Sequence, residues 1–475
     1  MSVPEGAGQI SPSRGRVAEL VRSAGLVGLV WLPFGIYLAG YFPGVMTFDS
    51  LDQWRQVVDG RWVDNQPVLH TAIVWVGVKT GGPGLVALFQ SVFLAAGLVR
   101  LARSLVEFGA DRRAVAVAVA ACVLNPAVGL FSVCLWKDVP FTAAVLFMAA
   151  AVVRCAAADS RGAPGGAVHA AILWGFVAAG LRQNGVAVSA TTLAAVAVLL
   201  PVVRRQAVFG TVGVLLFFGL TRAVAVPVLG LQPMPQIAGL GTVVHEIAAV
   251  VRHRPESVDA ADWRTLERVA APAHWYGGYV CESSHPLQTA EFDAVALEES
   301  GPDVVRVWSR LVRREPLVLL GHRACVSRIA WDPTHETGTW FFTATRGIEL
   351  NDLGLESSPL SWALHQRLNE VVSWTEGPGR LNFFWRAPMW VWLAFAMLGV
   401  TAWRRRGVGV WVLAAPIVGQ QLSILLYNTA QDARYMAASG LVAVLLSALW
   451  VPRSRPGATA EAYIPTGRWK WMSSM

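Results

Sequence analysis

The sequence predicts an all-α polytopic membrane protein with about ten transmembrane helices and a mostly helical extracytoplasmic domain. Three observations support this fold class. Of the 475 residues, 54% are hydrophobic and only 15% are charged, and a soluble chain of this length needs more charge to cover its surface. Apolar runs of about 20 residues recur along the chain. Arginines gather in the short loops beside alternate runs, as the positive-inside rule requires of cytoplasmic loops.

The basic net charge does not indicate a nucleic-acid partner. The chain carries a formal charge of +8. Its excess arginines are explained by their place next to apolar segments, where they orient the chain in a bilayer. We therefore expect the lipid bilayer as a partner and no nucleic acid.

The apolar runs set the expected division of the chain. A basic N-terminal segment precedes the first run, and no small-residue cleavage site follows that run, so it predicts a retained anchor. The expected spans are residues 22–42, 84–100, 114–133, 139–155, 167–181, 185–202, 207–229, 386–403, 408–427 and 435–451. The expected domains are a cytoplasmic segment 1–21, an N-terminal transmembrane domain 22–229 with a first outer loop 43–69, an extracytoplasmic domain 230–385, C-terminal transmembrane helices 386–451, and a disordered cytoplasmic tail 452–475.

Loop charges predict a multi-pass protein of the plasma membrane with both termini in the cytoplasm. Arginines follow the second, fourth, sixth, eighth and last spans, which places these loops on one side. The short apolar stretch 70–79 would invert every later loop if it crossed the membrane. It is therefore interpreted as a re-entrant or interfacial helix, which is allowed at membrane depth where it lines a protein cavity.

Cys281 and Cys325 both fall in the expected extracytoplasmic domain, where disulfides persist. Sequence gives no distance between them, so a bond and two free thiols both remain open.

Asp49 and Ser50 lie where the first span leaves the bilayer. An ionisable group at that depth is costly and usually has a partner or a function. Asp49 could be a general base or a ligand for a divalent cation such as Mg²⁺ or Mn²⁺. The alternative is structural, since Asp or Ser often opens an amphipathic helix such as the run Leu51–Gln56. Either residue could cap while the other faces a site.

Lys137 and Asp138 lie at the outer end of the third span. Asp138 followed by Pro140 is typical of a helix start. That interpretation leaves Lys137 unexplained, because it is one of only three lysines and lies on the side that positive charge avoids. An ammonium there could bind a phosphate.

Two more outer loops carry an arginine against the same charge trend. The run RQNG holds Arg182 and Asn184, and the run DARY holds Arg434 and Tyr435. Guanidinium groups bind phosphate with two hydrogen bonds. The structural alternatives are a tight Asn-Gly turn with a snorkelling arginine, and an Asp–Arg neighbour pair with an interfacial tyrosine. His70, in the first outer loop, could be structural or bind substrate.

Four motifs, FPGVMTFDSLDQW, LWKDVPF, RQNG and DARY, resemble runs in bacterial membrane proteins grouped with the GT-C superfamily of integral-membrane glycosyltransferases. The resemblance covers about residues 20–230 and 385–452. It implies an enzyme that transfers a sugar from a polyprenyl-phosphate donor to a lipid, glycan or protein acceptor on the outer face of the membrane. Asp49 would then match the catalytic acid of the first loop.

The resemblance also implies that Lys137, Arg182 and Arg434 neutralise the departing phosphate. Many members have paired acids in the first loop, whereas this chain has Asp49-Ser50, which leaves metal dependence open. A glycan ligase or polymerase with a polyprenyl-pyrophosphate donor needs the same leaving-group chemistry. A lipid or solute transporter fits less well, because its ionisable residues would lie near the middle of the spans.

Overall fold

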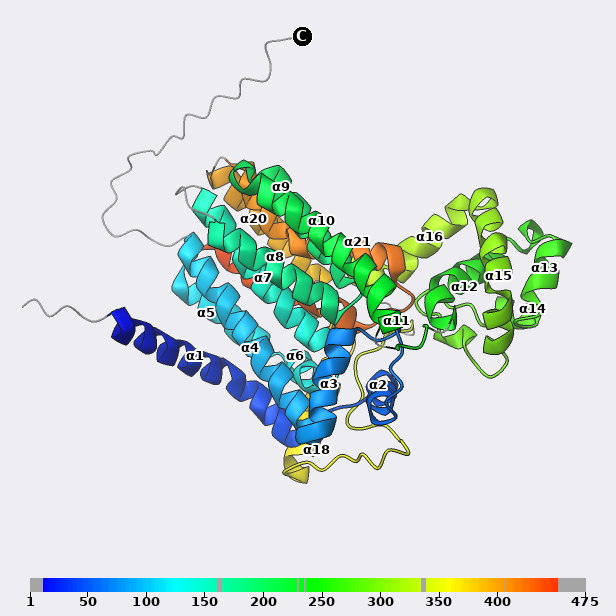
Figure 1. Cartoon of the computed structure of the whole chain (residues 1–475), viewed down its shortest axis with the longest axis horizontal. Coiled ribbons are helices and arrows are strands. Elements are labelled where there is room, and N and C mark those ends of the chain that lie inside the picture. Colours follow the sequence, from blue (N-terminus) through cyan, green and yellow to red (C-terminus); the bar gives the residue numbers. More distant parts are fainter. Residues whose placement is uncertain are drawn as a thin grey trace, which may run out of the picture.

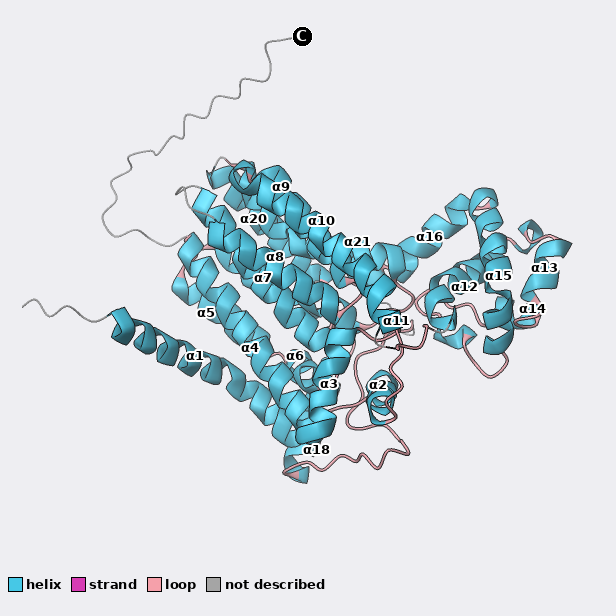
Figure 2. Cartoon of the chain, in the orientation of Figure 1, coloured by secondary structure: helices cyan, strands magenta, loops and turns pink. Residues whose placement is uncertain are grey.

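The computed structural model describes residues 12–159, 165–228, 230–234, 236–334, 339–405 and 407–451. All regular elements in this part of the chain are helices, which confirms the all-α fold class (Figures 1 and 2). The tail after residue 451, which was expected to be disordered, lies outside the described residues.

Most helices form one bundle, and two short helices lie at one end of it (Figure 1). The bundle contains α1 (Pro12–Gly40), α4 (Gly82–Phe108), α5 (Arg112–Val123), α6 (Pro126–Val133), α7 (Asp138–Asp159), α8 (Gly165–Leu181), α9 (Gly185–Leu199), α10 (Arg204–Leu220), α20 (Pro388–Arg405), α21 (Ala415–Tyr427) and α22 (Ala437–Ser447). The end helices are α2 (Phe48–Val58) and α3 (Val68–Thr80).

Six helical segments in the described residues are long and apolar enough to cross a membrane, or seven if one bent pair is a single span. They are Val21–Gly40, Gly82–Phe108, Asp138–Ala157, Pro201–Val228, Val408–Tyr427 and Ala433–Trp450. The expected count of ten is therefore not confirmed. The bundle is compatible with a multi-pass membrane protein.

The expected third span is broken into α5 and α6, which meet at an angle of 62°. Asn125 ends the first piece and caps the second, because its side chain accepts a hydrogen bond from the backbone N–H of Ala127 at 2.9 Å. Pro126 at the first position of α6 lacks the N–H that a continuous helix would use. The Asn-Pro pair thus redirects the chain within the bundle.

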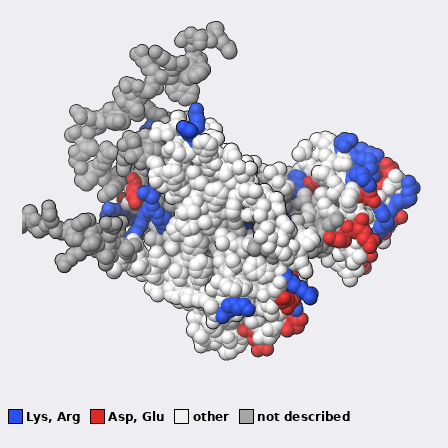
Figure 3. All heavy atoms as spheres, viewed as in Figure 1, with Lys and Arg blue, Asp and Glu red and all other residues white. Residues whose placement is uncertain are grey.

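The bundle packs on small residues and exposes apolar ones. Gly97 of α4 lies so close to α7 that an added Cβ would be 3.1 Å from the carbonyl oxygen of Ala143. Such small-residue contacts are typical of helices packed in lipid. Phe209, Leu216 and Leu220 on α10 are more than half exposed. Figure 3 shows the middle of this face of the bundle almost free of charged residues, whereas charge gathers at the ends of the bundle and on the second helical region, which is described next.

That second region contains α12 (Gln236–His253), α13 (Ala260–Leu266), α14 (Pro272–Gly277), α15 (Ala294–Arg314), α16 (Pro316–Val326) and α17 (Arg328–Trp331). It has a hydrophobic core of its own around Trp275, Leu297 and Val304, all fully buried. We call residues 236–331 the appended domain. An irregular segment, 339–361, then runs under α2 to α18 (Trp362–Thr375), and α19 (Arg380–Phe384) leads back to the bundle (Figure 1).

Candidate functional site

Four chain segments meet at the bundle end that carries α2 and α3. The centre is residues 429–433, whose backbone pairs with Ser283 on one side and with Phe342 on the other. Met46, just before α2, pairs in turn with Ile348 of the irregular segment. These isolated bridges join the bundle, the appended domain and the irregular segment into one support for the side chains described next.

Asp49 and Arg434 form an ion pair across 385 residues of sequence. The carboxylate of Asp49 lies 2.7 Å from Nη1 of Arg434, and the same guanidinium lies 2.8 Å from Asp432 through Nε. The Arg434 side chain is only 10% exposed, whereas that of Asp49 is 45% exposed. Asp49 therefore connects a buried cation to the surface.

The cap interpretation of Asp49 is not what the structure shows. Thr47 occupies the N-cap position of α2 and makes no side-chain cap bond, while Asp49 lies in the first turn and pairs with Arg434. An acid in the first turn still interacts favourably with the helix dipole. The hydroxyl oxygen of Ser50 is buried and forms no hydrogen bond with any other described residue.

A second buried ion pair lies beside the first. Arg182, at the end of α8, contacts Asp138 at the start of α7, and both side chains are at most 8% exposed. The turn that carries Arg182 closes tightly, because a Cβ on Gly185 would lie 2.1 Å from the carbonyl oxygen of Ala178. Asn184 is the N-cap residue of α9 without a side-chain cap bond. Arg182 is thus a buried partner and does not snorkel.

Aromatic rings join the two arginines. The guanidinium of Arg182 lies 4.8 Å from the ring centre of Tyr435, and that of Arg434 lies 5.3 Å from the same ring. The ring centre of Trp136 lies 4.9 Å from the Arg434 guanidinium. The indole N–H of Trp136 donates to the hydroxyl of Thr47 at 2.8 Å. Cation–π contacts of this kind hold each guanidinium plane in place.

Lys137 completes the group of cations. Its ammonium donates to the amide oxygen of Gln66 at 3.0 Å. His70 is fully buried behind it, where Nδ1 bonds to Gln53 at 2.8 Å. The structure therefore brings Asp49, Lys137, Arg182 and Arg434 to one place, and His70 belongs to the supporting shell.

Electrostatics within this group favour a charged Asp49. Burial alone would raise the pKa of Asp49, but Arg434 and Lys137 outweigh it, and the pKa lies below its ordinary value. Burial lowers the pKa of the Lys137 ammonium, and Asp49 and Asp138 only partly offset that effect. Burial, together with the nearby carboxylates, raises the pKa of Asp432 to about 7 despite Arg434.

Arg434 of this cluster also lines an apolar groove. It has a volume of about 280 Å³ and runs between the α5–α6 bend, α19–α20 and α22. Arg434, Trp136 and Arg386 lie on its wall together with apolar residues that continue into the bundle. The apolar lining residues include Cys122, Val128, Phe131, Phe384, Leu441 and Val444.

Sequence reasoning missed two residues near this groove. Arg386 is 2% exposed. Its guanidinium donates hydrogen bonds to the backbone carbonyl of Asp332 at 2.9 Å and to the side-chain amide oxygen of Gln431 at 3.3 Å. Arg386 is the first residue of the expected span 386–403, at the outer end, so the charge rule that singled out Arg182 could have found it. His285 contacts Trp340 edge to face at 5.3 Å and lies close enough for its charge to lower the pKa of Asp49. Nothing in the local sequence marks His285.

The donor set does not fit a divalent cation. Asp49, Asp138 and Asp432 each pair with a guanidinium, so a cation bound to any of them would lie against a like charge. Within the described ranges, three metal-ligand side chains converge only at Cys281, Glu282 and Cys325. There the two sulfur atoms are joined in a disulfide.

Comparisons of this chain with protein-family models, with curated proteins and with solved structures found no match.

Proposed function

We propose that this protein is a membrane glycosyltransferase of the GT-C type, which transfers a sugar from a polyprenyl-phosphate donor to a lipid, glycan or protein acceptor. One observation carries the proposal: Arg434, which pairs with Asp49, is also one of the residues that line an apolar groove in the bundle. A long apolar chain ending in a phosphate has the same two parts, and burying the chain contributes about 0.8 kcal/mol per CH₂.

The cations suit the leaving group. Arg434, with Arg386 on the same groove and Lys137 beside it, can neutralise the charge that grows on the phosphate as the sugar departs. Their positions are fixed before the donor binds, because rings and hydrogen bonds hold them. Preorganised charge of this kind is the largest catalytic contribution in many enzymes.

Asp49 is the proposed general base. Paired with Arg434 it is a weak base, because its pKa is lowered. A donor phosphate that takes the Arg434 guanidinium would remove that partner and leave burial to raise the pKa of Asp49. The base then accepts the proton of the acceptor hydroxyl, the acceptor oxygen bonds to the anomeric carbon, and the bond from that carbon to the phosphate oxygen breaks. Prenyl phosphate leaves with the electron pair.

The proposed orientation places this site on the outer face of the plasma membrane, with ten spans and both termini in the cytoplasm. The disulfide between Cys281 and Cys325 supports it, since such bonds persist outside the cytoplasm. A glycan ligase or polymerase with a pyrophosphate donor is the second candidate, favoured by the additional cation Arg386 on the groove.

Substitution of Asp49 tests the proposal against a matched control. Asp49→Asn keeps the size of the side chain but cannot accept a proton, and we expect at least about a 100-fold loss of transfer. Asp52→Asn, one turn along α2, removes an acid that bonds to Gln56 and should change transfer little. The assay incubates membranes with radiolabelled prenyl-phosphate sugars. Equal transfer by wild type and Asp49→Asn would remove Asp49 from the mechanism.

A further inference from the structure

We propose that Gln431 is a positioning residue for Arg434, and that the Cys281–Cys325 disulfide holds Gln431 in place. The inference rests on the proposed function only for what Arg434 binds. Three regions of the chain meet at Gln431, which lies three residues before Arg434.

Gln431 uses its backbone and its side chain to join those regions. Its backbone N–H donates to the carbonyl of Glu282 at 2.8 Å, and its own carbonyl accepts from Phe342 at 3.0 Å. Its side-chain amide donates to the carbonyl of Cys325 at 3.1 Å and accepts from Arg386 at 3.3 Å. Gln431 is 2% exposed, so these bonds form away from water. A buried residue with this many partners has a fixed position.

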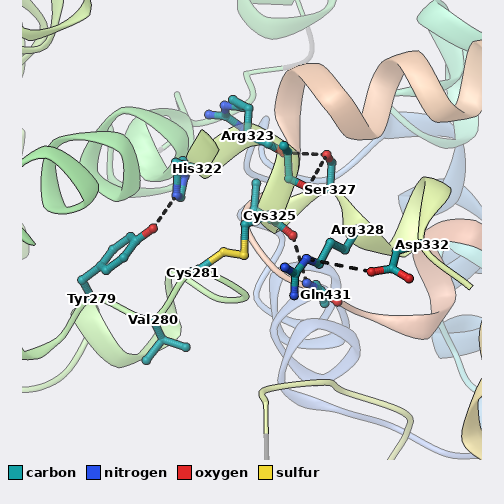
Figure 4. The surroundings of a disulfide bond; sticks show 12 residues. Tyr279, Val280, Cys281, His322, Arg323, Cys325, Ser327, Arg328, Asp332 and Gln431 are labelled. Atoms are coloured by element: carbon teal, nitrogen blue, oxygen red, sulfur yellow. Dashed lines mark hydrogen bonds and ion pairs between the residues drawn. A yellow bond between two sulfur atoms is a disulfide. The ribbon is translucent and has the colours of Figure 1, made fainter. Parts of the chain in front are cut away.

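The disulfide holds two of these partners together. Cys281 precedes Glu282, and Cys325 itself supplies the carbonyl that the Gln431 amide contacts (Figure 4). The bond joins residues 44 apart in sequence, with Cα atoms 6.1 Å apart. It thus fixes the loop before Glu282 relative to the end of α16, and Gln431 bonds to both.

The position of Gln431 determines the position of Arg434, because the short backbone segment between them is hydrogen-bonded. Ala433 donates its N–H to Phe342 at 2.9 Å, and the carboxylate of Asp432 accepts from the backbone N–H of Arg434 at 3.1 Å. The backbone N–H groups of Gln431, Ala433 and Arg434 are therefore all hydrogen-bonded. A shift of Gln431 would therefore move the Arg434 guanidinium relative to Asp49. The disulfide would thus affect the Asp49–Arg434 pair without touching it.

The competing explanation is that the disulfide only stabilises the appended domain. Neither cysteine belongs to the hydrophobic core of that domain, which is built around Trp275 and Val304. The two explanations differ in where loosening should occur when the bond is broken. Positioning predicts loosening at residues 429–435, and stabilisation predicts it in α12 to α15.

The experiment uses the full-length protein in detergent, oxidised or reduced with a phosphine, together with the double variant Cys281→Ser/Cys325→Ser. Hydrogen exchange of residues 429–435 and the Kd for farnesyl phosphate are measured. Breaking the bond should raise exchange at 429–435 and weaken farnesyl phosphate binding about tenfold, or 1.4 kcal/mol. Cys122, Cys134 and Cys155 are unbonded, so the double variant should be insensitive to the reductant.

The variant Gln431→Met tests the positioning role while leaving the disulfide intact. It keeps the length of the side chain but loses both side-chain bonds, and it should weaken binding to a similar extent. Combined with the double serine variant it should add little, because both changes release the same segment. Unchanged exchange at 429–435 after reduction would overturn the inference. If the oxidised protein does not bind farnesyl phosphate at all, the proposed donor is wrong, and the exchange data still decide the positioning role.

Discussion

The bundle end and the appended domain use charge in different ways. In the appended domain, Asp303 pairs with Arg268 and Arg306, and all three side chains are at least 37% exposed. Its buried acid Asp262 pairs with Arg310 and Arg314, which remain about 40% exposed.

At the bundle end the cations themselves are buried. Arg182 and Arg434 are at most 10% exposed, and Arg434 pairs both with its neighbour Asp432 and with the distant Asp49. The free energy needed to remove two such charges from water can equal or exceed their Coulomb attraction. A buried ion pair is therefore weak evidence for a stabilising role. Most ion pairs of the appended domain leave the arginine in contact with water. The exception is Arg323, which is 14% exposed, pairs with Glu246 and also donates to the carbonyl oxygen of Asn428. We therefore propose a binding function for the buried arginines at the bundle end.

Removing Arg434 should give the largest effect. Arg434→Gln would leave Asp432 buried without its cation, which costs about 3–5 kcal/mol in the free energy of unfolding, and transfer should be lost. Arg268→Gln in the appended domain should cost at most about 1 kcal/mol and leave transfer intact. Thermal unfolding in detergent and the transfer assay measure both. Similar behaviour of the two variants would erase the distinction between the regions.

The coupling between paired charges should differ in the same direction. A double-mutant cycle on Arg182 and Asp138 should give an interaction energy of about 2–3 kcal/mol, because both groups are buried. The same cycle on Arg268 and Asp303 should give a much smaller interaction energy, since water screens both groups. An interaction at the bundle pair as small as at the surface pair would show that its burial has no energetic consequence.

Filling the groove tests the lipid part of the site. Val128→Trp on α6 places a large ring in the groove and should raise the Kd for farnesyl phosphate at least about tenfold, because the added ring occupies space that the ligand needs. Val117→Trp on α5 and Val295→Trp on α15 change residues that are 69% exposed, and both should bind normally. Normal binding by Val128→Trp would place the ligand elsewhere.

The sequence predicted the all-α class because hydropathy reports burial in lipid directly. It also singled out Asp49, Lys137, Arg182 and Arg434, since each charge violates a rule about where charge is tolerated. It could not pair them, because Asp49 and Arg434 are 385 residues apart and only the folded bundle joins them. The Asn125-Pro126 pair is a signal for a break in the helix, and it was missed because the rest of the run 114–133 is apolar. Gln431 acts through hydrogen bonds to backbone groups, and His285 through a ring contact and its electrostatic effect on Asp49. No local pattern reveals either role.

The smallest effect concerns the pH dependence of stability. The pKa of Asp432 is raised from 3.8 to about 7, so between these values the folded state holds a proton that the unfolded state has lost. Stability from this group is complete below about pH 4 and falls as pH rises through about 7. The pKa of Asp303 is lowered, mainly by its hydrogen bond with Arg268, so its contribution is lost as pH falls.

Thermal unfolding of the wild type and of two variants measures the two contributions. Asp432→Asn should flatten the change in melting temperature between pH 4 and pH 7, whereas Asp303→Asn should alter only the acid side. The opposite signs follow from burial, which favours the neutral acid at Asp432, and from exposed guanidinium contacts, which favour the charged acid at Asp303. If Asp432→Asn retains the wild-type slope, the bundle end does not hold a protonated acid, and Asp432 is a permanent counterion of Arg434.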